Sequence, residues 1–361
     1  MYCRKCGVKL TENAKYCHRC GTPAWYEESV VPQSPSIQCT PPEMTNEQTP
    51  VVVSSTLSDG RLPQVGASYP PQRPAKRGRK PGTTLLLSFL MFVGVFVFQI
   101  FGYVIGSMFG DTGELSATIG SAVGATCGIV ALGGVSLIRP DLQAIALAFK
   151  KGWWAIFVGA ALFVFGIMES FVFAPGEIVP DWPVRVLWLC ALCAAIGFSE
   201  EGMFRGILLG GVLDVCGKNR QGIIMAAGIS ALLFGVAHVE WWSMNWLDPL
   251  QAIQAVLKMI QTGTLGFFFA ALVIKGKSIW GVAILHGLSD LLIMIPSIGL
   301  LGESATVSYV NSGEDAIATI VLYLVVIAVY LPLVWSGVKM LREVPVPDRG
   351  AFHKDPQSLQ R

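Results

Sequence analysis

The amino-acid sequence predicts an all-α polytopic membrane protein with about eight transmembrane helices, preceded by a small cysteine-rich module and a disordered linker. Three observations predict this class. Of the 361 residues, 53% are hydrophobic and only 14% are charged, whereas a soluble domain carries about 25% charged residues. Apolar segments long enough to cross a bilayer recur between residues 84 and 340. Lysine and arginine gather in alternate connections between these segments, as they do in membrane proteins.

The first 21 residues hold four cysteines in a pattern typical of a structural metal site. Cys3, Cys6, Cys17 and Cys20 form two Cys-x-x-Cys pairs, and a glycine follows each pair. The spacing lets both sulfurs of a pair reach one ion, and glycine permits the turn that follows. The module resembles the short zinc ribbons at the N-termini of many bacterial membrane proteins, which implies one structural Zn²⁺. A redox dithiol pair or two disulfides is the alternative.

The segments that flank the membrane region are polar. Residues 22–81 are rich in Pro, Ser, Gln and Thr and have no sustained periodicity, which predicts a disordered linker. Residues 342–361 are expected to form a cytoplasmic tail. The net charge is only +2, so nucleic acid is not an expected partner.

Residues 82–341 are predicted to form the membrane domain. Its runs lack the alternation of barrel strands, and open sheets cannot exist in lipid, so the spans must be helices. The expected spans are 84–108, 115–137, 152–173, 184–213, 222–240, 251–274, 278–297 and 316–340.

The charges between the spans predict that both termini are cytoplasmic. Basic residues precede the first span and follow the second, fourth, sixth and eighth, whereas acidic residues dominate the other connections. Because positive charge is retained on the cytoplasmic side, this alternation requires an even number of spans. We expect an integral protein of a bacterial cell membrane.

Charged residues inside the fourth span are the most informative feature of the chain. Glu200, Glu201 and Arg205 lie in an otherwise apolar helix, where each charge costs about 2.5 to 3.5 kcal/mol on insertion scales. Glu201 and Arg205 are four residues apart, so they share a helix face and can pair. Glu200 points elsewhere and is free for another role. A buried ion pair that only fixes helix packing is the structural alternative for Glu201 and Arg205.

Two histidines accompany these acids. His238 ends the fifth span, and His286 lies in the seventh, four residues before Asp290. A glutamate beside a histidine is the composition of a site that activates water. Each histidine could instead make only a structural hydrogen bond. If the fifth span ends near residue 240, His238 lies far from the mid-bilayer position of Glu200, and the sequence does not resolve this difference in depth.

The order of these residues resembles the CPBP family of intramembrane proteases, which includes the CAAX proteases, the bacteriocin-processing enzymes and Abi-like proteins. The family pattern of EExxxR, FxxxH and HxxxN or HxxxD is present as Glu200-Glu201…Arg205, Phe234…His238 and His286…Asp290. The resemblance implies a protease core at about 184–297, with Glu200 as general base and His238 assisting it. It also implies that His286 and the residue four later stabilise the oxyanion, while Glu201 and Arg205 hold the shape of the site.

The expected function is hydrolysis of peptide bonds in membrane-attached substrates, such as CAAX-like or leader-type peptides. Two histidines with carboxylates could also bind Zn²⁺ at this site, and a metal-free glutamate mechanism fits equally well. The alternative function is a non-catalytic scaffold whose zinc ribbon recruits a cytosolic protein partner. A proton-coupled transporter is disfavoured because the sequence shows no inverted repeat.

Overall fold

The computed structural model describes residues 81–110, 113–173, 176–239, 241–242, 244–303 and 310–346. The predicted zinc ribbon (1–21), with Cys3, Cys6, Cys17 and Cys20, lies outside these residues, as do almost all of the linker (22–81) and most of the tail (342–361). Those predictions therefore remain untested.

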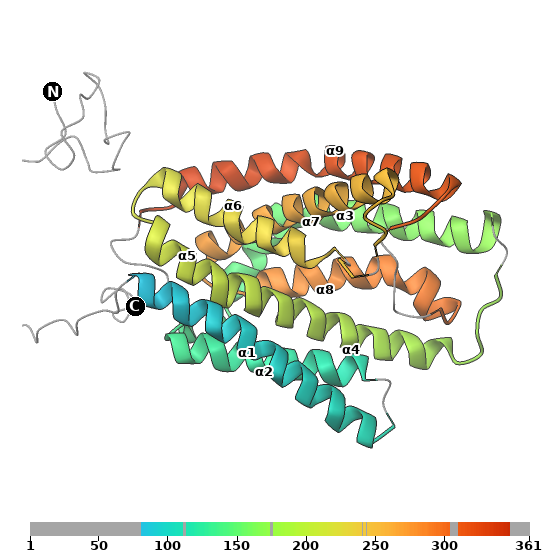
Figure 1. The fold of residues 1–361 in the computed structure, drawn as a ribbon, viewed down its shortest axis with the longest axis horizontal. Helices are drawn as coiled ribbons and strands as arrows, with labels where there is room; N and C mark the ends of the chain where they lie inside the picture. Colours follow the sequence, from blue (N-terminus) through green and yellow to red (C-terminus); the bar gives the residue numbers. More distant parts are fainter. Residues whose placement is uncertain are drawn as a thin grey trace, which may run out of the picture. The chain divides into compact units, whose positions relative to one another are not determined.

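The described chain consists of helices and their connections, without a β-strand. Eight of its segments are long and apolar enough to cross a membrane, which confirms the predicted fold class for this part of the chain. Figure 1 shows most of the helices running lengthwise through the bundle. The α-helices are α1 (Pro81–Met108), α2 (Glu114–Leu132), α3 (Leu142–Met168), α4 (Trp182–Glu201), α5 (Leu209–Cys216), α6 (Arg220–Ala237), α7 (Pro249–Gly276), α8 (Trp280–Met294) and α9 (Glu314–Glu343).

Four shorter segments interrupt or extend these helices. A 3₁₀-helix, η1 (Val135–Ile138), follows α2, and π-helices form η2 (Glu169–Phe173), η3 (Gly202–Leu208) and η4 (Ile295–Leu300). Because η3 joins α4 to α5 without a break, one apolar segment runs from Trp182 to Cys216. This segment is the predicted fourth span, and it carries the two glutamates.

Two predicted span boundaries were wrong. The third span was expected to begin at residue 152, but α3 begins at Leu142, where the Asp141 carboxylate caps the helix by accepting hydrogen bonds from the next backbone amides. The second span was expected to end at 137, but α2 ends at Leu132, because Gly133 adopts a left-handed conformation with φ 89°. Most residues just beyond α2 remain apolar, and Lys150 and Lys151 inside α3 resembled a polar connection, so composition concealed both boundaries.

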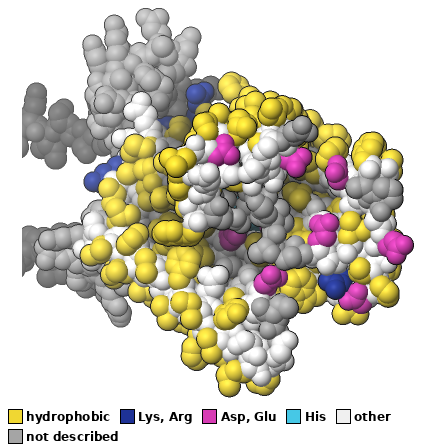
Figure 2. All heavy atoms as spheres, turned by 45° about the vertical axis from the view of Figure 1, so that its right-hand side comes forward, with side chains coloured by type: hydrophobic (Ala, Val, Ile, Leu, Met, Phe, Trp, Pro, Cys, Tyr) yellow, Lys and Arg dark blue, Asp and Glu magenta, His cyan; other side chains and the backbone are white. Residues whose placement is uncertain are grey.

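The surface of the bundle matches a membrane environment. Large hydrophobic side chains are exposed along the lengths of α1, α3 and α9. Figure 2 brings the right-hand end of Figure 1 forward and shows Asp and Glu side chains spread over that end. The described acidic residues in the connections there are Glu177, Asp181, Asp248 and Glu303. We call this the acidic end. The opposite, basic end carries Lys218, Lys275, Lys277, Lys339 and Arg342.

Helices α4 and α8 cross with their backbones in contact. A Cβ atom on Gly197 would lie 2.3 Å from the Ala283 carbonyl oxygen, and one on Gly287 would lie 2.5 Å from the Cys193 carbonyl oxygen. Only glycine permits this approach. The contact brings the end of α4 against the middle of α8, and the intramembrane polar residues meet there.

Candidate active site

Glu201 and Arg205 form the buried base of the site. Glu201 ends α4 and Arg205 lies one turn later in η3. Arg205 Nη1 donates to Glu201 Oε1 at 3.0 Å, and both side chains are fully buried. The pair that the i,i+4 spacing predicts is therefore present. The π-helix at this point also suits a functional site, because such segments are frequent there.

Aromatic rings and one backbone carbonyl complete the surroundings of the Arg205 guanidinium. It lies 4.0 Å from the centroid of the Phe234 ring, and its Nη2 donates to the Gly266 carbonyl at 3.1 Å. A Cβ on Gly266 would lie 2.9 Å from that same nitrogen, so a glycine is needed here. The guanidinium is thus held by a carboxylate, a carbonyl and a cation–π contact, which offset part of its cost of burial.

His286 connects the two glutamates. Its Nδ1 lies 2.9 Å from Glu201 Oε1, while its Nε2 faces Glu200 Oε2 at 3.8 Å and Asp290 Oδ2 at 3.4 Å. Glu201 Oε1 already accepts from Arg205, so Nδ1 of the histidine is the donor in this pair. That bond orients the ring, and Nε2 is left to act on the side of Glu200.

His238 approaches Glu200 from α6. Its Nδ1 donates to the Phe234 carbonyl at 2.8 Å, since a carbonyl can only accept, and its Nε2 lies 3.4 Å from Glu200 Oε2. His238 and Glu200 therefore lie at the same depth, which the sequence did not resolve. The helix α6 ends at Ala237, and Figure 1 shows this end stopping short of the neighbouring ends of α3, α4 and α8. His238 therefore lies within the bundle.

All six predicted site residues come together from three helical segments. Glu201, Arg205 and His286 are buried, whereas Glu200, His238 and Asp290 are partly exposed. The Nε2 atoms of both histidines face the same oxygen of Glu200. The buried residues orient the site, and the partly exposed Glu200 carboxylate, whose Oε2 is itself buried, is the candidate group to act on water.

Three further residues contact or influence the site, and the sequence reasoning did not identify them as site residues. Phe234 packs between Arg205 and the His238 ring, and the ring of Phe269 lies 5.6 Å from that of His286. The position of Phe234 four residues before His238 was a sequence signal that could have identified it as a site residue. Phe269 gave none, because it lies in a run of three phenylalanines.

Lys258 on α7 is the third of these residues. It is partly buried, and its charge interacts with those of Asp290 and Glu200. Its ammonium group lies 5.9 Å from the centroid of the Tyr323 ring. A lone lysine inside the predicted span 251–274 was a usable signal, since intramembrane charges are functional candidates by default.

The side chains of the site have the chemistry of zinc ligands but not the arrangement. Glu200, His238, His286 and Asp290 are chemically suitable ligands for Zn²⁺. However, no group of three or more His, Cys, Asp or Glu side chains among the described residues is arranged to hold a metal ion. We therefore derive the proposed mechanism from the side chains alone, and none of its steps passes through a metal.

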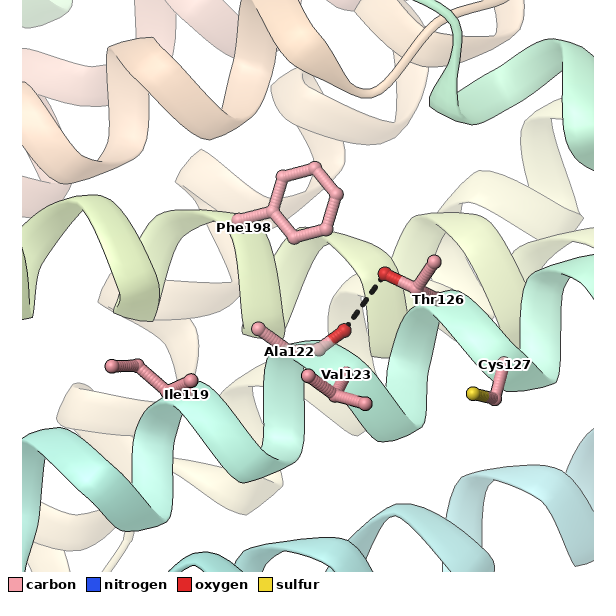
Figure 3. Close-up of a pocket in the computed structure, with 6 residues that line it drawn as sticks. All are labelled: Ile119, Ala122, Val123, Thr126, Cys127 and Phe198. Carbon is pink, nitrogen blue, oxygen red and sulfur yellow. Dashed lines mark hydrogen bonds between the residues drawn. The ribbon is translucent and has the colours of Figure 1, made fainter.

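A shallow apolar groove lies between α2 and Phe198 of α4. Its volume is about 310 Å³, and its walls come from α2 and from Phe198. Figure 3 shows its only drawn hydroxyl, that of Thr126, already bonded to the Ala122 carbonyl at 2.9 Å. Ser121 and Ser199 are hydrogen-bonded to each other and hold α2 against α4 beside Glu200. The groove thus offers apolar surface and no catalytic group.

Comparison with known proteins agrees with the chemistry of these residues. A search of curated proteins found no match to the chain. A match to a family model covers residues 181–292, an interval that contains all six candidate residues. It supports intramembrane endopeptidase activity in general terms and a membrane-attached peptide or protein as substrate. Over this interval the chain is similar to the family described as type II CAAX prenyl endopeptidase, Rce1-like.

Proposed function

We propose that this protein is an intramembrane endopeptidase in which Glu200 is the general base and His238 assists it. The observation that carries the proposal is the approach of two imidazole Nε2 atoms to one oxygen of Glu200, at 3.4 Å and 3.8 Å. These distances are longer than good direct hydrogen bonds. The carboxylate can therefore accept a proton from water while both rings stay close to the reacting atoms.

Hydrolysis begins when Glu200 takes a proton from water and the hydroxide attacks the scissile carbonyl carbon. A C–O bond forms, and the carbonyl oxygen becomes an oxyanion. His286 Nδ1 is bonded to Glu201, so an N–H at Nε2 can donate a hydrogen bond to this oxyanion. Preorganised donors of this kind often contribute more to the rate of acyl transfer than any other group in the site.

Collapse of the intermediate breaks the C–N bond, and the leaving amine takes the proton that Glu200 received. The His238 Nδ1 bond to the Phe234 carbonyl keeps that nitrogen protonated. His238 Nε2 is then free to hold the water or to relay the proton. Asp290 lies 3.4 Å from His286 Nε2 and orients this ring. An ionised carboxylate cannot itself donate to the oxyanion, so the donor is His286.

The test compares cells that contain the wild-type protein or the Glu200→Gln variant. This substitution keeps the volume of the side chain and removes the base, so we expect turnover to fall about 10²- to 10⁴-fold. Peptide termini created in membrane proteins by the wild-type protein should be absent with the variant. The variant should accumulate to the wild-type level, which serves as the folding control. Cleavage at the wild-type rate by the variant would end this mechanism and favour the scaffold function.

A further inference from the structure

Lys258 lies on the side of α7 that faces the candidate site. It precedes Phe269 by about three helical turns, so the two side chains leave the helix only about 20° apart. The Phe269 ring lies 5.6 Å from the ring of His286 on α8. Because α7 and α8 are joined by the short connection at Lys277, they run in opposite directions. Lys258 and Asp290 therefore lie on the same side of the contact between Phe269 and His286, away from that connection.

The ammonium group of Lys258 is directed into the bundle. It lies 5.9 Å from the centroid of the Tyr323 ring on α9, and Tyr323 is only 8% exposed. Its charge interacts with the charges of Asp290 and Glu200. A lysine that served only as a membrane anchor would extend toward the lipid headgroups instead. Lys258 is thus placed among the charges of the candidate site.

The carboxylates of the site need a second positive charge besides that of Arg205. Glu201 and Arg205 neutralise each other in their buried pair. Glu200 and Asp290 remain, and their like charges repel each other. Charges within a membrane protein are costly unless opposite charges accompany them. Lys258 interacts with both of these carboxylates and supplies the positive charge.

The charge of Asp290, and not its shape, is what requires Lys258. His286 Nε2 lies 3.4 Å from Asp290 Oδ2. An asparagine would have nearly the same shape and could present an oxygen to the same nitrogen, but it would carry no charge. An aspartate at this position therefore needs a nearby cation that an asparagine would not need.

We propose that Lys258 is a positioning residue of the candidate site, whose charge holds the Asp290 carboxylate beside His286 and offsets its repulsion from Glu200. Lys258 acts through Asp290 and does not have to touch the substrate. Without its charge, repulsion from Glu200 displaces Asp290, and the His286 ring loses the oxygen that orients it. The inference rests on the proposed function only in the expectation that loss of Lys258 slows hydrolysis.

A double-mutant cycle tests this pairing. Lys258→Met removes the charge and keeps a long unbranched side chain, whereas Asp290→Asn removes the opposite charge and keeps an oxygen. Both single variants and the double variant are made in the full chain. The measurements are the unfolding temperature in one detergent and the rate at which new peptide termini appear in the membrane proteins of cells. Lys275→Met on the same helix is the matched control, because Lys275 pairs with Glu343 at 2.6 Å.

We expect Lys258→Met to lower the rate of hydrolysis about tenfold, within the range of coupling between interacting residues, and to lower the unfolding temperature. Adding Asp290→Asn to Lys258→Met should recover at least about threefold in rate and part of the lost unfolding temperature, because the uncompensated charge is then gone. Adding it to Lys275→Met should recover neither. Lys258→Arg, which keeps the charge, should retain more activity than Lys258→Met.

Three results would overturn the inference. They are a wild-type rate in Lys258→Met, an equal loss in Lys258→Arg and Lys258→Met, and effects of Lys258→Met and Asp290→Asn that simply multiply. If Lys258→Met does not fold, as judged by its elution as a monodisperse species, Lys258→Gln takes its place in the cycle. If Lys258→Gln also fails to fold, recovery of monodisperse protein on adding Asp290→Asn supports the pairing, and no recovery contradicts it.

Failure of this inference is distinguishable from failure of the proposed function. The unfolding temperatures require no substrate. If Glu200→Gln retained hydrolysis, the general-base mechanism would fail, while recovery of the unfolding temperature in the double variant would still test the pairing. If the cycle showed no coupling, the role of Lys258 would fail, while the effect of Glu200→Gln would still test the mechanism.

Discussion

At the scale of single residues, the two adjacent glutamates have different surroundings and therefore different roles. Glu201 is fully buried and accepts hydrogen bonds from Arg205 and His286 through one oxygen. Glu200 is partly exposed and faces the Nε2 atoms of two histidines. Because consecutive helix positions are rotated by about 100°, neighbouring acids can face separate partners. One glutamate orients the site, and we propose that the other acts on water.

This difference predicts that a Glu→Gln substitution lowers protein stability at position 201 but changes it little at position 200. Glu201→Gln leaves Arg205 as a buried charge without its carboxylate, so we expect a loss of about 3 to 5 kcal/mol in the free energy of unfolding. Glu200→Gln should change stability little while it lowers the rate of hydrolysis about 10²- to 10⁴-fold. The measurement is thermal unfolding of both variants in the same detergent. Equal melting temperatures for the two variants would contradict the assignment.

At the scale of elements, the crossing of α4 and α8 determines whether the site forms. Glu201 and His286 are 85 residues apart in the chain, yet their side chains are 2.9 Å apart. The crossing depends on Gly197 and Gly287, which lie within about one turn of these residues and have no Cβ to separate the helices. Helix packing in membranes commonly uses small residues in this way.

We expect Gly287→Ala to lower both stability and activity. The new methyl group would lie 2.5 Å from the Cys193 carbonyl oxygen, and overpacking of this kind costs about 1 to 3 kcal/mol. The displaced α8 would also carry His286 away from Glu201. Gly228→Ala on α6 is the matched control, because a Cβ there would meet nothing within 4 Å. The comparison uses unfolding temperature and the rate of hydrolysis. If Gly287→Ala had the same unfolding temperature and hydrolysis rate as Gly228→Ala, the site would not depend on the close crossing of α4 and α8.

At the scale of the whole molecule, we expect the predicted zinc ribbon and the membrane site to be chemically independent. Four thiolates complete the tetrahedral shell of a zinc ion and leave no open position for a substrate. The membrane site supplies imidazoles and carboxylates, which in the described residues are not arranged as a metal-binding group. We propose that the ribbon binds one structural Zn²⁺ and a cytosolic protein partner, and that hydrolysis does not need the ribbon.

Metal analysis of purified full-length protein checks this separation. We expect one zinc ion per chain in the wild-type protein and none in the Cys17→Ser/Cys20→Ser variant, because loss of two thiolates destroys a four-thiolate site. The variant should still hydrolyse substrate in the purified state. Zinc retained by the variant, together with inhibition by a membrane-permeant chelator, would show instead that the membrane site is a metalloprotease centre.

Local sequence was sufficient for the fold class, and it singled out six of the polar residues that the structure brings together. Span number follows from apolar length, and the pairing of Glu201 with Arg205 follows from helix periodicity, so neither requires knowledge of distant parts of the chain. The boundaries at Leu132 and Leu142 were missed because a glycine conformation and a capping carboxylate, not composition, set them.

The sequence by itself determined a bundle of about eight spanning helices and the set of charged and imidazole side chains inside it. Only the tertiary structure decided that His286 lies between the two glutamates, that His238 reaches Glu200 from the end of a short helix, and that Lys258 lies near the site. The physical reason is that such contacts depend on where helices begin, end and cross. The crossing of α4 and α8 is set by close backbone packing at glycines, and helix ends are set by local caps, neither of which the apolar pattern of the chain encodes.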